Sequence, residues 1–425
     1  MPAFILIKKC DLVLAIIITY RGIRMNFEQL QLHPNIYKAI KLCGYTKPTP
    51  IQAKAIPHIL ANEDVIASAQ TGTGKTAAYI LPALNQLSKQ KSGRKARMLI
   101  LAPTRELATQ ITQVIGKYGK FMHVNIASLV GGMSYRQQMR ELAKSVDIII
   151  ATPGRLMDYM KNHRLDLSGI EILVLDEADR MLDMGFIDDV KTIVKATPKH
   201  RQTLLFSATV DEKLAAITKQ LMHKPIRINL SQEKMAPPLI KQELYLADSL
   251  QHKNTLLRHF LENTNIYKAI IFSATKVNAD RLANQLRDAG LSASALHGDL
   301  KQNIRNKTLT QLRRGNIQFL VATDVASRGI DVNDISHIIN YDLPRFSEDY
   351  VHRIGRTGRA GKTGVAISIA MQSDFRHLQK IEHYIGNKLE RLTVEGLEPK
   401  KSERVEHNAG RKKPRGIKQK RRYYK

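Results

Sequence analysis

The sequence has 425 residues, which is too long for one ordinary hydrophobic core and predicts two domains of about 200 residues or fewer. Its hydrophobic fraction of 43% is sufficient for folded domains, and its two cysteines, Cys10 and Cys43, exclude a disulfide framework and a cysteine-based zinc site. The formal net charge of +29 and the pI near 10.0 indicate a polyanionic partner, with nucleic acid ahead of an anionic membrane surface.

Residues 1–24 contain a short apolar run, Leu12 to Ile18, which follows Lys8 and Lys9. The run is shorter than the roughly 20 residues that a membrane span needs, and no small-x-small cleavage site follows it. We expect translation to begin at Met25, so that residues 1–24 are an upstream extension. A disordered or loosely packed arm and a targeting segment are the alternatives.

The next stretch predicts a helix and then a stiff loop. Apolar residues from Leu30 to Leu42 have amphipathic spacing, which predicts a helix that ends near Gly44. The loop that follows contains Pro48 and Pro50 and ends at Gln52, whose amide can both donate and accept on one base edge.

A phosphate-binding loop is predicted from Ala69 to Thr76, which read Ala-Gln-Thr-Gly-Thr-Gly-Lys-Thr. Val65 to Ala67 before it predict a buried strand, and Ala77 to Leu81 after it predict a helix. Glycines let backbone N–H groups point at phosphates, and the helix N-terminus adds partial positive charge. Lys75 is placed to reach the β/γ-phosphates and Thr76 to hold Mg²⁺, although Ala69 stands where the general pattern has glycine.

Short apolar runs then alternate with helix-like stretches, which predicts a parallel sheet covered on both faces. Polar signatures follow these runs, where ligands of such sheets bind. The runs are Met98 to Ala102, Asn125 to Val130, Val146 to Ala151, Ile172 to Leu175 and Thr203 to Phe206. The signatures begin at Pro103, Gly131, Thr152, Asp176 and Ser207.

Two adjacent carboxylates, Asp176 and Glu177, follow the run that ends at Leu175. About a hundred residues after a phosphate-binding loop, the first of them is in the expected place to hold Mg²⁺. The second is the candidate base that orients and deprotonates water for hydrolysis.

A second α/β domain is predicted after a linker. The periodicity lapses from about Asn229 to Lys241, and apolar runs then resume. Ser273-Ala274-Thr275 repeats the triplet at Ser207, which suggests that the two domains are related. The runs are Ala269 to Phe272, Ser292 to Leu296, Phe319 to Ala322, His337 to Asn340 and Val365 to Ala370.

The second domain carries a dense arginine cluster, His-Arg-Ile-Gly-Arg-Thr-Gly-Arg, from His352 to Arg359. Arginines brought across an interface onto a γ-phosphate act as fingers, worth on the order of 10³–10⁵ in rate. With the phosphate-binding loop on one domain and the fingers on the other, hydrolysis is expected to require domain closure.

Together these motifs, from about Phe27 to Leu397, resemble those of the DEAD-box ATP-dependent RNA helicase family, and Asp176 to Asp179 spell the Asp-Glu-Ala-Asp of its name. The resemblance implies two tandem RecA-like domains, each a parallel sheet with helices on both faces, plus a disordered basic C-terminal tail. It also implies ATP and Mg²⁺ as cofactors, and RNA as a partner bound through its backbone without sequence specificity. The expected segments are 1–24 (extension or arm), 25–228 (ATP-binding domain), 229–241 (linker), 242–397 (second domain) and 398–425 (tail).

The resemblance assigns roles in ATP binding and hydrolysis. The expected catalytic residues are Lys75, Glu177, Arg356 and Arg359, and the expected Mg²⁺ ligands are Thr76 and Asp176. The expected ATP-binding residues are Phe27, Tyr45, Gln52, Gln70, Thr71, Gly72, Thr73, Gly74, Lys75, Thr76 and Asp331. Ser207 and Thr209 are expected to couple hydrolysis to strand separation.

The resemblance also implies RNA contacts in both domains. Those of the first domain are Pro103, Thr104, Arg105, Gly132, Thr152 and Arg155. Those of the second are His297, Gly298, Asp299, Gln302, Arg305, Thr323 and Asp324. Ser327 replaces a usual alanine, and Ile270 to Thr275 are an unusual form of their motif, but neither change removes a charged or Mg²⁺-binding group.

Among family members, the chain looks most like the bacterial RhlE and SrmB group, linked to ribosome assembly and RNA turnover. Ribosomal precursor particles or RNA-decay proteins are therefore possible partners, and we expect a cytoplasmic location without membrane association. The alternatives are an ATP-gated RNA clamp that does not unwind, and a DNA helicase with related domains, against which the motif ending at Gln52 and the Asp-Glu-Ala-Asp sequence argue.

The C-terminal tail provides a test. Residues 400–425 contain twelve Lys or Arg and two Glu with almost no aliphatic residues, so they are predicted to be disordered and to attract phosphates without reading sequence. Removing them should weaken RNA binding evenly across sequences and lower the salt dependence by roughly 0.7 in slope per lost phosphate contact with single-stranded RNA. An unchanged slope in a titration of RNA affinity against salt would mean that the tail does not touch RNA and only aids solubility.

Overall fold

The structure is a computed structural model that describes residues 26–69, 72–89, 95–162, 164–210, 212–230, 240–327, 332, 334–358 and 363–400. The predicted upstream segment and almost all of the predicted tail lie outside the described residues, as do residues 231–239 of the predicted linker. Four predicted site residues also lie outside them: Gln70, Thr71, Asp331 and Arg359.

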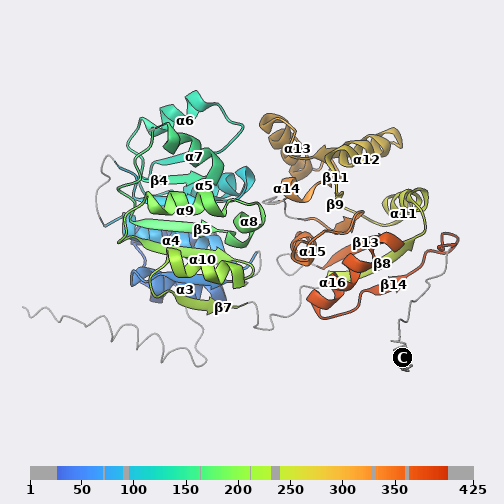
Figure 1. Ribbon diagram of the computed structural model, residues 1–425, viewed down its shortest axis with the longest axis horizontal. Helices are drawn as coiled ribbons and strands as arrows, with labels where there is room; N and C mark the ends of the chain where they lie inside the picture. The colour runs from blue at the N-terminus through green and yellow to red at the C-terminus, as the bar shows by residue number, and fades with distance from the viewer. Residues whose placement is uncertain are drawn as a thin grey trace, which may run out of the picture.

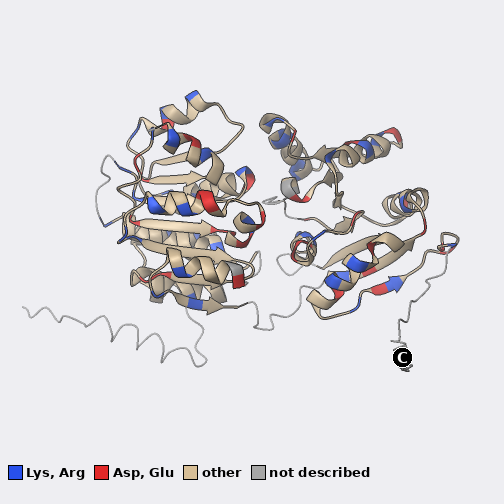
Figure 2. Cartoon of the chain, in the orientation of Figure 1, with Lys and Arg blue, Asp and Glu red and all other residues tan. Residues whose placement is uncertain are grey.

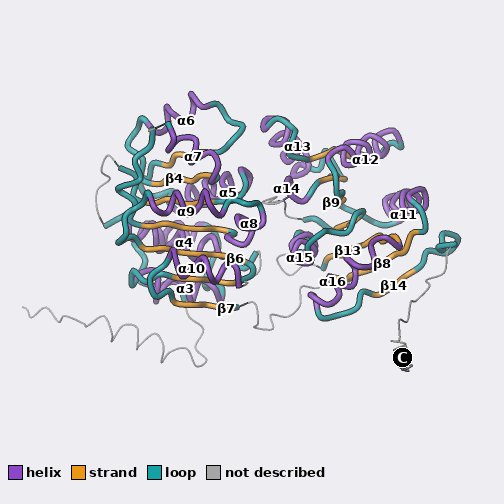
Figure 3. Tube along the Cα trace, viewed as in Figure 1, coloured by secondary structure: helices purple, strands orange, loops and turns teal. Residues whose placement is uncertain are grey.

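The described chain folds around two sheets of seven strands each, which lie in two separate domains (Figures 1 and 3). The first sheet has the order β3-β4-β2-β5-β6-β1-β7, and its strand pairs are parallel. Its strands are β1 (Val65–Ser68), β2 (Met98–Leu101), β3 (Ile126–Leu129), β4 (Ile148–Ala151), β5 (Ile172–Asp176), β6 (Gln202–Ser207) and β7 (Ile226–Asn229).

The second sheet repeats the topology of the first. Its order is β10-β11-β9-β12-β13-β8-β14, again with parallel pairs, so each strand corresponds to the strand seven numbers earlier. Its strands are β8 (Ile240–Ala247), β9 (Ala269–Phe272), β10 (Ala293–Leu296), β11 (Phe319–Ala322), β12 (His337–Asn340), β13 (Gly364–Met371) and β14 (Glu390–Leu392). The prediction of two tandem α/β domains with parallel sheets is confirmed.

Each apolar run that was predicted to be a strand forms one, but three further strands of the described residues, β7, β8 and β14, were not predicted. β7 and β14 each lie at one edge of their sheet and at least half of their residues are polar, so they lack the continuous apolar pattern of a buried strand. β8 is only partly buried, and the three polar residues from Lys241 to Glu243 interrupt its apolar pattern.

Helices cover both faces of each sheet, and each face has its own core. In β2, Met98 and Ile100 pack into one apolar cluster, whereas Leu99 and Leu101 pack into the cluster on the opposite face. The helices of the first domain are the 3₁₀ helix η1 (Phe27–Leu30), α2 (Pro34–Leu42), α3 (Pro50–Leu60), α4 (Lys75–Leu87), α5 (Arg105–Tyr118), α6 (Tyr135–Leu142), α7 (Pro153–Lys161), α8 (Ala178–Asp183), α9 (Ile187–Lys195) and α10 (Glu212–Leu221).

The second domain has the same layered arrangement, with separate apolar clusters on the two faces of its sheet. In Figure 1, α13, α14 and α15 lie on the side of this domain that faces α5 and α8 of the first. Its helices are α11 (Leu250–Asn263), α12 (Lys276–Asp288), α13 (Gln302–Arg314), α14 (Asp324–Ser327), α15 (Ser347–Ile354), the 3₁₀ helix η2 (Gln372–Asp374) and α16 (Phe375–Ile385).

The predicted helix from Leu30 to Leu42 is wrong in its start. Leu30 lies in η1, and α2 begins only at Pro34, which is favoured in the first turn because it lacks an N–H. Leu42 is 62% exposed, so it does not belong to the buried face that Ile36 and Ile40 form.

The two Ser-Ala-Thr triplets do not occupy equivalent places. Ser207 ends β6, whereas Ser273 follows β9, which corresponds to β2. Thr275 caps α12 by accepting from Asn278 N at 3.1 Å, as Thr104 caps α5 by accepting from Leu107 N at 3.3 Å. The evidence that the two domains are related is therefore their shared strand order and not the repeated triplet.

Basic residues are spread over both domains in Figure 2. Over the described residues, no helix has the length and apolar character that crossing a bilayer requires.

Candidate functional site

The glycine-rich loop joins β1 to α4 as predicted. Gly72 and Gly74 have φ angles of +83° and +93°, in the left-handed region that favours glycine. α4 begins at Lys75, whose side chain is buried and donates from Nζ to the carbonyl oxygen of Ala69 at 2.6 Å. The lysine ammonium therefore lies inside the loop that is expected to bind phosphate.

Gln52 supports this loop from α3. Its Nε2 donates to the carbonyl oxygen of Gly74 at 3.2 Å, and its Oε1 accepts from the backbone N of Thr49 at 3.0 Å. A Cβ atom at position 74 would lie 2.5 Å from Gln52 Nε2, so the contact needs glycine. The side-chain amide of Gln52 therefore joins the proline-containing loop, which is expected to bind adenine, to the phosphate-binding loop.

The two aromatic residues expected at the adenine have different surroundings. Phe27 is only 4% exposed and packs in the apolar core of the first domain. Tyr45 is 48% exposed, and Lys117 Nζ lies 5.3 Å from the centroid of its ring. Only Tyr45 therefore presents an aromatic face at the surface.

Asp176 ends β5 and is buried, with 3% of its surface exposed. Tyr79 OH donates to its Oδ2 at 2.7 Å. Burial and then the charge of Glu177 raise the pKa of Asp176 to about 6, against the opposing effect of Lys75. A nearby cation would stabilise the ionised form of this carboxylate, and Thr76 lies in the first turn of α4, three residues before Tyr79, so Asp176 and Thr76 offer oxygen atoms of the kind that Mg²⁺ prefers.

Glu177 differs from its neighbour in exposure and backbone conformation. It is partly exposed and has a φ of +50°, which is uncommon for a residue other than glycine and carries backbone strain. Its N–H donates to Asp176 Oδ1 at 3.0 Å, and its carbonyl begins α8. The turn thus directs one carboxylate inward and leaves the second accessible to water.

Asp179 connects this turn to the triplet after β6. Its Oδ2 accepts from Ala208 N at 3.0 Å, from Thr209 N at 3.1 Å and from Thr209 Oγ1 at 3.2 Å. Its own N–H donates to Ser207 Oγ at 3.3 Å. The two residues predicted to couple hydrolysis to strand separation are therefore held by the helix that follows Glu177.

The predicted RNA contacts of the first domain gather at the carboxyl ends of β2, β3 and β4. Thr104 and Thr152 occupy the N-cap positions of α5 and α7, and Pro103 lies directly before Thr104. Arg105 packs against Gly132, and a Cβ atom added at position 132 would lie 2.1 Å from Arg105 Nη1. Arg155 donates to the carbonyl oxygens of Val130 at 3.2 Å and Met133 at 2.7 Å. Helix N-termini and guanidinium groups together attract anions.

In the second domain, Arg305 lies 5% exposed and donates from Nη1 to the carbonyl oxygen of His297, which precedes Gly298. His297 Nδ1 and Arg305 Nε are buried without a hydrogen-bond partner among the described residues. Thr323 follows β11, and its N–H donates to the carbonyl oxygen of Leu296. Buried polar atoms without partners indicate a position for a polar ligand.

The predicted RNA contacts of the first domain and those of the second domain lie close together between the domains. Arg305 forms an ion pair with Glu106 at 2.6 Å, and Gln302 Nε2 donates to the same carboxylate at 3.3 Å. Arg105 has its pKa lowered by burial and then by the charges of Arg305 and Arg155. The guanidinium groups of Arg155 and Arg305 are thus close enough to Arg105 to affect its charge, which fits the predicted role of these three residues.

The arginine cluster begins on α15, where Arg353 is held by Asp324 through Nε at 2.6 Å and Nη2 at 2.7 Å. Arg353 Nη1 also donates to Asn340 Oδ1 at 3.1 Å. Arg356 follows Gly355, which caps α15, and is 9% exposed. Arg353, which is buried and forms a bidentate ion pair, therefore fixes α15, the helix that precedes the predicted finger Arg356.

A buried ion pair joins this helix to the first domain. Arg180 of α8 donates from Nη1 to Asp349 Oδ1 at 2.5 Å, and the two side chains are 4% and 9% exposed. Both residues line a small cavity together with Phe272, Asp324, His352, Arg353 and Arg356. The turn that carries the predicted base Glu177, which we call the hydrolysis turn, is thus in direct contact with α15, the helix that precedes the predicted finger Arg356.

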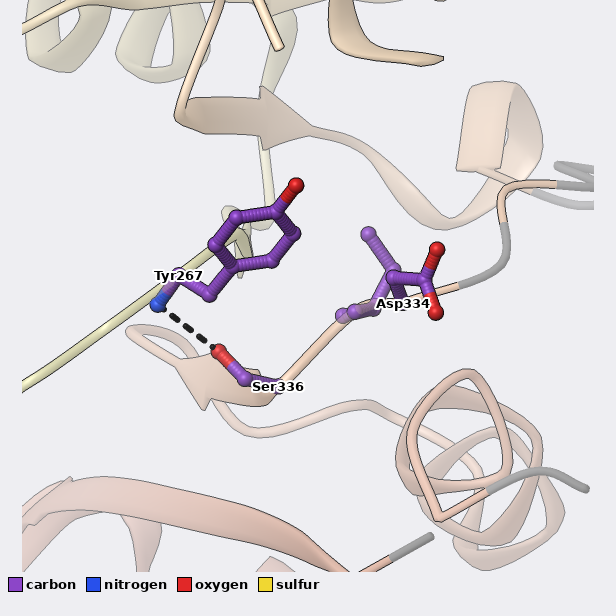
Figure 4. Close-up of a pocket in the computed structure, with 4 residues that line it drawn as sticks. Tyr267, Asp334 and Ser336 are labelled. Atoms are coloured by element: carbon purple, nitrogen blue, oxygen red, sulfur yellow. Dashed lines mark hydrogen bonds between the residues drawn. The ribbon is translucent and has the colours of Figure 1, made fainter. Parts of the chain in front are cut away.

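A larger cavity of about 340 Å³ lies away from these residues, beside Tyr267, Asp334, Ile335 and Ser336 (Figure 4). Tyr267 N donates to Ser336 Oγ at 3.1 Å, and these residues precede β9 and β12. Ligands of parallel sheets bind at the opposite, carboxyl ends of the strands, so this cavity is not part of the candidate site.

Several site residues were given no role by the sequence. Tyr79, Arg180 and Asp349 act through contacts with residues far away in the chain, and Asp179 and Arg353 were recognised only as parts of their motifs. Tyr79 lies one helical turn after Lys75, and that spacing was the available signal for it.

Two family models match the chain. Residues 49–217 match the model described as DEAD/DEAH box helicase, and residues 252–361 match the model described as Helicase conserved C-terminal domain. Similar proteins include the ATP-dependent RNA helicase SrmB of Haemophilus influenzae, 42% identical over 379 residues, which are 88% of this chain and 86% of that protein. The DEAD-box ATP-dependent RNA helicase CshA of Geobacillus kaustophilus is 42% identical over 367 residues, 86% of this chain and 78% of that protein.

Solved structures also resemble the chain over most of its length. Saccharomyces cerevisiae Dbp5 bound to RNA and ADP BeF3 has a TM-score of 0.79 at 34% identity, covering 86% of this chain and 95% of that one. Mss116p bound to ssRNA and AMP-PNP has a TM-score of 0.80 at 30% identity, and the match covers 88% of this chain and 81% of that one. A DEAD box protein from Methanococcus jannaschii is 39% identical but has a TM-score of 0.51, and the match covers 87% of this chain and 99% of that one.

The accessible position of Glu177 predicts the effect of Glu177→Gln. The amide keeps the size of the side chain but cannot take a proton, so steady-state ATP turnover should fall by roughly 10²–10⁴. ATP and RNA affinities should persist, because the backbone N–H of residue 177 still supports Asp176.

Glu212→Gln is the matched control, because Glu212 is exposed at the start of α10. Its turnover should equal that of the original protein. If Glu177→Gln hydrolyses ATP at the original rate, Glu177 is not the base.

Proposed function

Because the chain belongs to the DEAD/DEAH box helicase family, we propose that it is an ATP-dependent RNA helicase that hydrolyses ATP when bound to RNA and thereby opens short RNA duplexes or remodels RNA–protein particles. The observation that carries this proposal is the meeting of the Asp176–Glu177 turn with the arginine helix α15 of the other domain, through the Arg180–Asp349 ion pair.

ATP is assigned to the loop before α4. Backbone N–H groups from Gly72 to Thr76, the helix N-terminus and Lys75 would bind the phosphates, while Gln52 and Tyr45 would bind the adenine. Gln70, Thr71 and Phe27 remain assigned to this site by family resemblance, as does Asp331 from the second domain. Mg²⁺ would be held by Asp176 and Thr76 and would neutralise charge on the phosphates when bound.

Hydrolysis is assigned to Glu177, which is partly exposed and free to orient a water molecule and take its proton. Arg356 would stabilise the negative charge that develops on the transferred phosphoryl group, together with Arg359. Arg353 does not reach the nucleotide in this assignment, because its guanidinium is already bound to Asp324 and Asn340. It instead fixes α15, the helix that ends just before Arg356.

RNA is assigned to the surface that both domains share near Arg105 and Arg305. Three guanidinium groups and two helix N-termini offer donors to phosphates and 2′-hydroxyl groups, and His297 Nδ1 is a further polar atom there without a partner among the described residues. Pro103 and Gly298 are next to Thr104 and His297 in sequence, Gly132 packs against Arg105, and Thr323 N donates to the carbonyl oxygen of Leu296, so we assign all four to the same surface. Ser207 and Thr209, bound to Asp179, would transmit the state of the ATP site to it.

The placement of the two domains supports an RNA-bound arrangement. The chain has TM-scores of 0.79 and 0.80 with the Dbp5 and Mss116p structures bound to RNA and ATP analogues, but 0.51 with the more similar sequence from M. jannaschii. Since single domains of related sequence share one fold, the lower score reflects a different relation between the domains. A clamp that holds RNA without unwinding it would use the same arrangement, and a strand-displacement assay separates the two activities.

The cellular setting follows from the chemistry and from relatives. The need for ATP and the presence of only two cysteines favour the cytoplasm. Similarity to SrmB and CshA supports bacterial ribosome assembly or RNA turnover as the process, with precursor particles or decay proteins as partners. The five segments given above are proposed as the domain boundaries.

The proposed function predicts the nucleic-acid dependence of ATP hydrolysis. Turnover should rise strongly with RNA and not with DNA of the same sequence, because 2′-hydroxyl groups contribute to the contacts. The measurement is steady-state phosphate release without nucleic acid, with RNA and with DNA. Equal stimulation by DNA would favour the DNA-helicase alternative, and no stimulation by either would contradict the proposal.

A further inference from the structure

We propose that the Arg180–Asp349 ion pair positions the arginine finger against the hydrolysis turn, so that RNA-stimulated hydrolysis depends on this contact. Arg180 and Asp349 are positioning residues in this proposal and do not touch ATP. The inference rests on the proposed function, since it concerns the same ATP site, and it adds a specific contact through which domain closure assembles that site.

The pair links the two catalytic segments by short stretches of chain. Arg180 N donates to the carbonyl oxygen of Glu177 at 3.0 Å, so Arg180 lies in the first turn after the proposed base. Asp349 lies on α15 one turn before Arg353 and two turns before Arg356. A movement of α15 relative to α8 would therefore change the distance between Glu177 and Arg356.

Each partner is fixed within its own domain. The turn that carries Arg180 is tied to the triplet after β6 through Asp179, which accepts hydrogen bonds from Ala208 N and Thr209 N. The helix that carries Asp349 is tied to α14 and β12 through the contacts of Arg353 with Asp324 and Asn340. The ion pair thus joins two rigid units, and it does not connect mobile surface side chains.

The burial of the pair makes it sensitive to loss of either member. When the domains separate, both charges return to water, so the intact pair contributes little net free energy to closure because its attraction is offset by desolvation. When one member is removed, the other charge must be buried without its partner, and closure becomes unfavourable. Burial alone would lower the pKa of Arg180, but the charges of Asp349, Glu177 and Asp179 raise it above its usual value.

The contact is separate from the cluster around Arg105 and Arg305 to which RNA is assigned, although Asp324, also an expected RNA contact, lines the cavity beside the pair and is bound to Arg353. The other ion pair between the domains, within the part of the chain that the structure describes, is Glu106–Arg305, which lies among the proposed RNA contacts. Arg180 and Asp349 line the cavity beside His352 and Arg356. Loss of this pair should therefore affect coupling at the ATP site rather than the intrinsic affinity for RNA.

The test is a double-mutant cycle on the full chain with Arg180→Ala, Asp349→Ala and the double variant. Each single change should lower the RNA-stimulated kcat on the order of 10²-fold. The affinity for ATP without RNA should remain within twofold, because neither side chain touches the nucleotide. The double variant should lose no more activity than either single variant, since the two changes remove one contact.

Lys191→Ala is the control, because it removes an exposed ion pair with Asp188 on α9 of the same domain and should leave kcat unchanged. The thermal unfolding midpoint should be the same for all variants, since the pair does not lie within either domain core. Additive losses in the cycle, a lowered unfolding midpoint that accounts for the lost activity, or single variants with normal kcat would each overturn the inference. Absence of RNA stimulation in the original protein would instead contradict the proposed function.

Discussion

The central physical constraint is that the residues proposed to act on one nucleotide lie in two separate domains. Asp176 ends β5 of the first domain and Glu177 follows it, whereas Arg353 and Arg356 belong to the second domain. In the proposed mechanism neither domain completes the site alone, because Arg356 approaches the Asp176–Glu177 turn only when α15 packs against α8. Burial of the Arg180–Asp349 pair shows how closely these two helices approach.

The shared topology explains why only one of the two domains is proposed to bind ATP. β8 corresponds to β1 and β12 to β5, so α11 occupies the place of α4, and Asp342 lies after β12 near the place that Asp176 and Glu177 have at the end of β5. In the second domain, Lys253 Nζ of α11 donates to Asp342 Oδ1 at 2.9 Å, and Asp342 Oδ2 accepts from Ala274 N at 2.8 Å. A lysine and a carboxylate at these two positions therefore pair with each other, and no glycine-rich loop follows β8.

The parts of the molecule that the sequence predicted correctly depend on local pattern. Apolar runs predicted every strand except β7, β8 and β14, and the loop before Lys75 predicted the start of α4, because burial and helix initiation are decided within a few residues. The edge strands β7 and β14 lacked that pattern. The Arg180–Asp349 contact spans 169 residues, so no local feature could indicate it. Likewise, the burial of Phe27 follows from packing of the whole first domain.

The claim that closure assembles the site is tested most directly by fluorescence energy transfer between the domains. Dyes at the exposed positions Asp188 and Val277, with Cys10 and Cys43 replaced by serine, would report the separation of α9 and α12. Since the buried interdomain pair contributes little net free energy, the account predicts a shorter distance only when RNA and a non-hydrolysable ATP analogue are both present. An equally short distance with either ligand alone, or with neither, would contradict it.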